Sequence, residues 1–136
     1  MLEAAASALP AEGTQLLGVT VLTSHTDETF KETGARGTIA EAVGRLVVLA
    51  RESGIDGVVC SPHEVKLIRE TAGDDLQIVT PGIRPKGSAR GDQARVTTPL
   101  EARRLGCDYI VVGRPITGAS SPKDAARAIV DEISRG

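Results

Sequence analysis

The sequence has few aromatic residues, few cysteines, no long apolar run and no excess of positive charge. Phe30 and Tyr109 are its only aromatic residues, which argues against a base-stacking surface for nucleic acid and leaves the core to aliphatic side chains. With 16 Lys and Arg against 18 Asp and Glu, the formal net charge is -2, so there is no overall positive field to attract nucleic acid. No apolar run approaches the roughly 20 residues of a membrane helix. We therefore expect no nucleic-acid partner and no membrane span.

The two cysteines, Cys60 and Cys107, each lie in or beside an apolar run, which is typical of small buried thiols. We expect no disulfide between them. Residues 1–11 lack the basic start and long apolar middle of a secretory signal. Together these features predict a cytoplasmic location.

The length of 136 residues, or 14.1 kDa, predicts a single domain spanning residues 1–136. Four short runs rich in Val and Ile do not alternate with polar residues, and they lie at 16–22, 57–60, 76–79 and 109–112. Such runs indicate parallel strands that are covered on both faces. The segments between them have a helical apolar period, and a further helix is expected at residues 2–9.

Signals for helix ends lie at the junctions between these elements. The capping-box spacing occurs at three places, Thr38 with Glu41, Ser61 with Glu64, and Thr98 with Glu101. Pro62 and Pro99 follow two of these caps, and Ser121, Pro122 and Asp124 form a close variant. Helix ends are expected near Gly54, Gly73 and Gly106. These patterns predict four successive βα units.

The βα units leave two architectures open. The six residues from Gly54 and the six from Gly106 enter two strands in a similar way, as a repeated unit would. Four units are half of the eight in a (β/α)8 barrel. The chain is thus either half of a barrel with two open sheet edges or a small open doubly wound sheet, of which a flavodoxin-like domain is one form. The initial helix and the lack of an acidic cluster after the first strand argue against the flavodoxin form.

Both architectures bind ligands beyond the carboxyl ends of the strands. Thr23 follows the first strand, where it is either a polar contact for a ring or an ordinary loop residue. His25 has no second ligand at metal-binding spacing, so a solvated loop histidine is the better interpretation. Cys60 and His63 do not form a reliable nucleophile pair across a strand end.

The loops after the third and fourth strands contain the residues that could bind an anionic ligand. Residues 80–95 combine three glycines with four cations, Arg84, Lys86, Arg90 and Arg95, in a slightly acidic chain. This pattern fits an anionic ligand or a solvated loop equally well. After the fourth strand, Gly113 would let a phosphate approach the backbone and Arg114 could grip its oxygens. Barrel phosphate sites are frequently built from the loops after the last two strands.

At these residues the sequence resembles the bacterial type of orotidine 5'-monophosphate decarboxylase. The matching segments occur in family order at residues 18–24, 56–61, 79–85, 91–93 and 108–117. The resemblance implies the carboxyl-terminal half of a (β/α)8 TIM barrel and a lyase of pyrimidine biosynthesis. That enzyme converts orotidine monophosphate to uridine monophosphate and carbon dioxide without a metal or organic cofactor.

The family analogy implies a role for each candidate site residue. Thr23 would contact the pyrimidine edge, and Pro81 would help to wall the site. Arg84 and Gln93 would belong to the phosphate-gripping loop, and Gly113 with Arg114 would hold the phosphate.

The departure from the family is large. The Asp-x-Lys-x-x-Asp motif with the proton-donating lysine is absent from the 136 residues, so no catalytic residue is assigned. We expect a fragment that is inactive alone, with its missing amino-terminal half or a further copy of itself as partner. The alternative is a non-catalytic, self-associating phosphate-binding half-barrel.

Overall fold

The computed structural model describes residues 1–10, 13–85 and 97–135. Its four strands form one parallel sheet in the order β1-β2-β3-β4, and they are β1 (Leu17–Val19), β2 (Gly57–Val59), β3 (Gln77–Thr80) and β4 (Tyr109–Ile110). All four were predicted from the apolar runs; β1, β2 and β4 are shorter than predicted, and β3 has the predicted length but begins one residue later. A doubly wound or flavodoxin-like sheet reverses its strand order at a switch point. The sequential order here is that of half a (β/α)8 barrel, so the doubly wound alternative was wrong.

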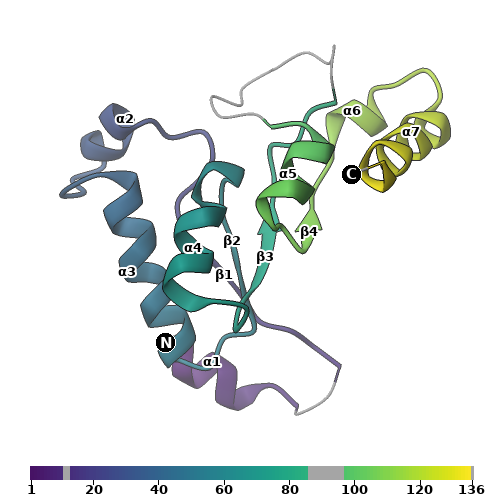
Figure 1. The fold of residues 1–136 in the computed structure, drawn as a ribbon. Helices are drawn as coiled ribbons and strands as arrows, with labels where there is room; N and C mark the ends of the chain where they lie inside the picture. The colour runs from purple at the N-terminus through teal and green to yellow at the C-terminus, as the bar shows by residue number, and fades with distance from the viewer. Residues whose placement is uncertain (11–12, 86–96, 136) are drawn as a thin grey trace.

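The helices follow the strands in alternation (Figure 1). They are α1 (Leu2–Ala8), α2 (Asp27–Glu32), α3 (Ile39–Glu52), the 3-10 turn η1 (Pro62–Glu64), α4 (Val65–Ala72), α5 (Pro99–Leu105), α6 (Arg114–Thr117) and α7 (Pro122–Ser134). The sequence predicted α1, α3, α4, α5 and α7. It missed α2 and α6, which are too short to show a helical apolar period.

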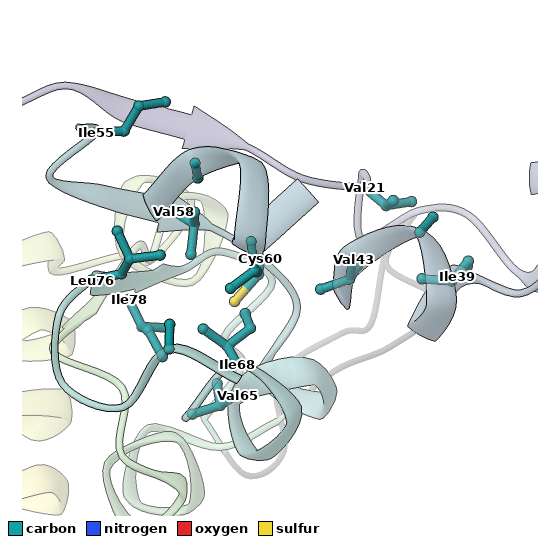
Figure 2. Close-up of a cluster of buried hydrophobic side chains, with 14 residues drawn as sticks. Val21, Ile39, Val43, Ile55, Val58, Cys60, Val65, Ile68, Leu76 and Ile78 are labelled. Atoms are coloured by element: carbon teal, nitrogen blue, oxygen red, sulfur yellow. The ribbon is translucent and has the colours of Figure 1, made fainter. Parts of the chain in front are cut away.

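The core lies between the sheet and the helix pair α3 and α4. Figure 2 shows Val58 and Ile78 of the sheet beside Val65 and Ile68 of α4, with Val43 of α3 completing the group. All five side chains have no exposed surface. This packing fixes the central strands against α3 and α4, and it thereby fixes the positions of the loops that follow those strands.

The three predicted capping boxes are confirmed. Thr38, Ser61 and Thr98 each begin a helical segment in which the glutamate three residues later bonds back to the cap backbone. A fourth box, between Thr26 and Thr29, begins α2 and was not predicted. The variant at Ser121 is confirmed as a helix start, since Ser121 is the N-cap and Pro122 the first residue of α7, but the Ser121 hydroxyl donates to the Asp124 carboxylate at 2.6 Å and makes no side-chain cap bond to the helix backbone.

The similar strand entries at residues 54–59 and 106–111 have a common hydrogen-bond pattern. The Asp56 carboxylate accepts the Leu16 N–H at 2.6 Å, and the Asp108 carboxylate accepts the Ile78 N–H at 2.7 Å. Gly54 and Gly106, two residues before each aspartate, have φ of 73° and 94°, a backbone conformation that favours glycine. The repeated sequence therefore encodes a repeated βα junction.

The outer strands do not have the two-sided cover that the apolar runs predicted. Val19 of β1 is 61% exposed and Tyr109 of β4 is 54% exposed. Each of these strands has one neighbour in the sheet. A continuous apolar run identifies a strand without showing that this chain alone covers it.

Cys60 is buried and Cys107 is half-buried, and among the described residues neither takes part in a disulfide. Burial raises the pKa of the half-buried Cys107 thiol, and a hydrogen bond with Thr80 opposes that rise. Within the described residues, no helix has the length and apolar character needed to cross a membrane.

Candidate site at the carboxyl ends of the strands

A small hollow opens at the carboxyl ends of β1 and β2 and beside the residue that follows β3. Its volume is about 190 Å³, and it is lined by Val19, Val21, Leu22, Thr23, Ser24, Val59, Cys60 and Pro81. The fold therefore brings two predicted site residues, Thr23 and Pro81, to one place from loops 58 positions apart. Larger hollows lie beside β1 and α3 and at the amino ends of the strands, away from the loops that the sequence indicated.

Thr23 is positioned by the chain leaving β1. Thr20 donates both its N–H and its hydroxyl to the Val59 carbonyl at 3.0 Å, which ties the end of β1 to β2. Two residues before Thr23, Val21 joins the apolar core. Thr23 itself is 8% exposed, so it is a buried polar residue at the wall of the hollow. A buried hydroxyl of this kind normally has a hydrogen-bond partner.

His25 has a local structural role. Its Nδ1 lies 3.2 Å from the Thr29 hydroxyl, and its ring meets Phe30 edge to face with centroids 6.2 Å apart. These contacts hold it against α2, so it is less solvated than predicted. Among residues 1–10, 13–85 and 97–135, no group of three or more His, Cys, Asp or Glu side chains could hold a metal ion.

Cys60 forms part of the wall of the hollow and is 1% exposed, whereas His63 is an exposed residue of η1. This difference agrees with the rejection of a nucleophile pair. Sequence patterns alone did not identify Cys60 as part of the wall. Its position directly after a strand was the available signal, because such residues border the ligand end of a parallel sheet.

Arg84 lies at the stem of the long loop. The Arg84 N–H donates to the Thr97 carbonyl at 3.0 Å, and a parallel bridge joins Ile83 with Thr97. The Arg84 side chain is 9% exposed, and its Nη1 donates to the Ile83 carbonyl at 2.9 Å. The Arg84 guanidinium is therefore a nearly buried cation. Because little water screens its charge, it would interact strongly with an anion that contacts it.

Gly113 and Arg114 lie where β4 ends and α6 begins. The Gly113 carbonyl accepts the N–H of Ile116 at 2.9 Å, which closes the first turn of α6. A Cβ at Gly113 would meet no heavy atom within 4 Å, so the backbone there is open to an approaching ligand. Arg114 is an exposed residue at the start of α6.

The predicted residues thus divide into two groups. Thr23 and Pro81 line the hollow, whereas Arg84, Gly113 and Arg114 follow β3 and β4 outside its lining. Gln93, with Lys86, Arg90 and Arg95, lies outside the described residues. The arrangement offers a small, largely apolar recess and separate cationic groups that follow the next strands. Those are the two kinds of surface that a phosphorylated ring compound needs.

The fold and this loop arrangement define half of a (β/α)8 barrel with its candidate ligand groups at the carboxyl ends of the strands. The sequence model of the Orotidine 5'-phosphate decarboxylase / HUMPS family matches residues 1–129. The chain belongs to this family.

Two curated relatives are named orotidine 5'-phosphate decarboxylase. The protein from Geobacter sulfurreducens is 54% identical over 125 residues, covering 92% of this chain and 52% of that protein. The protein from Halorhodospira halophila is 56% identical over 136 residues, covering 98% of this chain and 58% of that protein. The chain therefore spans about half the length of these relatives.

Solved structures show the same relationship. The orotidine 5'-phosphate decarboxylase from Lactobacillus acidophilus superposes with a TM-score of 0.79 at 44% identity, covering 98% of this chain and 58% of that one. The enzyme from Pyrococcus horikoshii gives a TM-score of 0.65 at 32% identity, covering 90% of this chain and 51% of that one. The four βα units are thus arranged as in part of those larger folds.

Proposed function

We propose that this chain supplies the pyrimidine-contacting and phosphate-holding half of an orotidine 5'-phosphate decarboxylase site. The complete site would convert orotidine monophosphate to uridine monophosphate and carbon dioxide. The observation that carries the proposal is the hollow shared by Thr23 and Pro81, at the ligand end of a half-barrel that belongs to this family.

The proposed roles of the individual residues follow from their positions. Thr23 and Pro81 would contact the base, because they line a small recess at this end of the sheet. Gly113 would offer its open backbone and Arg114 its charged fork to the phosphate. Arg84 would add positive charge from the loop stem, and Gln93 would add an amide donor.

The chemical step would need groups from outside these 136 residues. Decarboxylation requires stabilisation of charge at the reacting ring carbon and delivery of a proton to it. The Asp-x-Lys-x-x-Asp motif that the family resemblance assigns to this step is absent from the sequence. The chain would then bind the nucleotide without catalysing its decarboxylation, and no metal or organic cofactor enters the proposal.

A complementation assay tests this proposal. The 136-residue chain, a separately produced amino-terminal half of the Geobacter sulfurreducens relative, and an equimolar mixture would each be assayed for loss of orotidine monophosphate. We expect no turnover by either half and measurable turnover by the mixture. An Arg114→Ala chain in the same mixture should lose activity mainly through a raised KM. Robust turnover by the 136-residue chain alone would overturn the proposal that the catalytic groups lie outside this chain.

A further inference from the structure

A buried carboxylate bonds to the chain directly after the wall of the hollow. Glu64 is 5% exposed, and its Oε2 accepts the Ser61 N–H at 3.0 Å in buried surroundings. Ser61 itself has no exposed surface. Taking a carboxylate out of water costs free energy, which a hydrogen bond offsets only in part. The buried position of Glu64 therefore needs a reason beyond the capping of a helix.

The two exposed capping boxes show what helix capping alone requires. The Glu41 carboxylate accepts the Thr38 N–H at 2.8 Å. The Glu101 carboxylate accepts the Thr98 N–H at 2.9 Å. Both glutamates are exposed, so each caps its helix while its charge stays in water. Capping by itself does not demand the burial seen at Glu64.

The bond to Ser61 acts on the backbone of Cys60. The Cys60 N–H donates to the Val79 carbonyl of β3 at 3.1 Å, which holds the peptide on one side of Cys60. The N–H that Glu64 accepts belongs to the peptide on the other side. Because a peptide unit is planar, that bond fixes the orientation of the Cys60–Ser61 peptide. The backbone of Cys60 is thus held by β3 before it and by Glu64 after it.

Cys60 separates the hollow from the core. Its side chain is 1% exposed and lines the hollow together with Val59 and Pro81. It also belongs to the core cluster that includes Val65 and Ile68 of α4 (Figure 2). A shift of the backbone here would therefore change both the shape of the recess and the packing of the core.

We propose that Glu64 is a positioning residue of the candidate site, which acts through the Cys60–Ser61 peptide to hold Cys60 in the wall of the hollow. The turn η1 brings the Glu64 carboxylate back to the strand end across three residues, and Pro62, which is fully buried, restricts the backbone between them. The effect of Glu64 on nucleotide binding rests on the proposed function, whereas its effect on Cys60 does not.

Alkylation of Cys60 by iodoacetamide, followed by peptide mass spectrometry, tests this role. Glu64→Met removes the acceptor and should raise the Cys60 rate roughly tenfold, because a buried thiol reacts through local opening that the bond opposes. Glu64→Gln keeps an acceptor oxygen and should retain most of the protection. Glu41→Met removes an exposed cap and should leave the Cys60 rate unchanged. The Cys107 thiol reports any general loosening and should react alike in every sample.

Three outcomes of this assay would overturn the proposal. The first is an unchanged Cys60 rate in Glu64→Met, and the second is a loss of protection in Glu64→Gln as large as in Glu64→Met. The third is an equal rise in Glu41→Met or a parallel rise at Cys107, either of which would show general destabilisation instead of an effect on the wall.

Hydrogen exchange of the unmodified chain is a second measurement that needs no variant to fold. The Ser61 amide should exchange at least about tenfold more slowly than the Thr38 amide, relative to their intrinsic rates, because only the Thr38 bond is exposed. Equal protection of the two amides would contradict a rigid, buried bond at Glu64.

Titration with uridine monophosphate separates this proposal from the proposed function. Glu64→Met should bind the nucleotide several-fold more weakly than the unmodified chain, and Glu41→Met should bind it equally well. Absence of binding by every form, together with the expected Cys60 rates, would contradict the proposed function and support the action of Glu64 on Cys60. Binding that Glu64→Met leaves intact would overturn the role of Glu64 in the site.

Discussion

The Arg69 guanidinium and the Asp108 carboxylate form an ion pair, with Nη2 and Oδ2 2.7 Å apart, that joins α4 to the residue before β4. Arg69 also donates to the backbone carbonyls of Gly73, Leu76 and Gly106. Asp108 in turn accepts the Ile78 N–H, so one pair links α4, β3 and the loop before β4. It lies at the amino ends of the strands, where a barrel carries stability rather than ligand contacts.

Replacing Arg69 by Met should lower the free energy of unfolding by about 2–3 kcal/mol, because several backbone carbonyls lose a charged donor. The Arg69 side chain is 20% exposed, which limits replacement of those bonds by water. Lys66→Met is the control, since the Lys66–Glu70 pair is 84% and 63% exposed and such pairs contribute about 0–1 kcal/mol. Urea denaturation measures both, and equal losses would contradict a structural role for the Arg69–Asp108 pair.

Replacing Ile68 by Ala should destabilise the chain by about 2–5 kcal/mol, because the side chain is fully buried between α4 and the sheet. Leu49→Ala on α3 is the control, since Leu49 is 48% exposed and should cost much less. Both can be measured by urea denaturation at one protein concentration. A small loss for Ile68→Ala would show that the core repacks.

Replacing Arg114 by Ala should weaken binding of uridine monophosphate by about 1.5–3 kcal/mol, the usual contribution of a hydrogen bond to a charged group. Arg127→Ala should have little effect, because Arg127 is an exposed residue of α7 that faces bulk solvent. Calorimetric titration at low salt compares the two. Equal weakening would indicate only diffuse attraction, and unchanged affinity in Arg114→Ala would remove that residue from the phosphate site.

The start of α3 should contribute a pH-dependent part of the stability. Hydrogen bonds from the backbone and hydroxyl of Thr38 lower the pKa of the Glu41 carboxyl. A group whose folded pKa is lowered stabilises the fold above its unfolded pKa, and that stabilisation is lost as pH falls through the folded value. Denaturation midpoints from neutral to acid pH should therefore fall less steeply for Glu41→Gln. An identical slope for both proteins would contradict this assignment.

The local elements of this fold were predictable because their signals are local. The capping boxes at Thr38, Ser61 and Thr98 appear where the sequence predicted them, because each depends on residues three positions apart. Gly106 ends α5 in the left-handed region, which was predictable because glycine has no Cβ to oppose that conformation. The family resemblance rested on short segments that occur in the same order as in the family. The family match over residues 1–129 confirmed it.

The sequence by itself thus determined the four strands, most of the helices and the loops that follow each strand. Only the tertiary structure decided which loop residues share a recess, because Thr23, Cys60 and Pro81 meet through the sheet register. It also decided that Val19 and Tyr109 remain exposed. An apolar run predicts a strand from local residues, but only the strand order shows that β1 and β4 are the outer strands, where each has a single neighbour in the sheet.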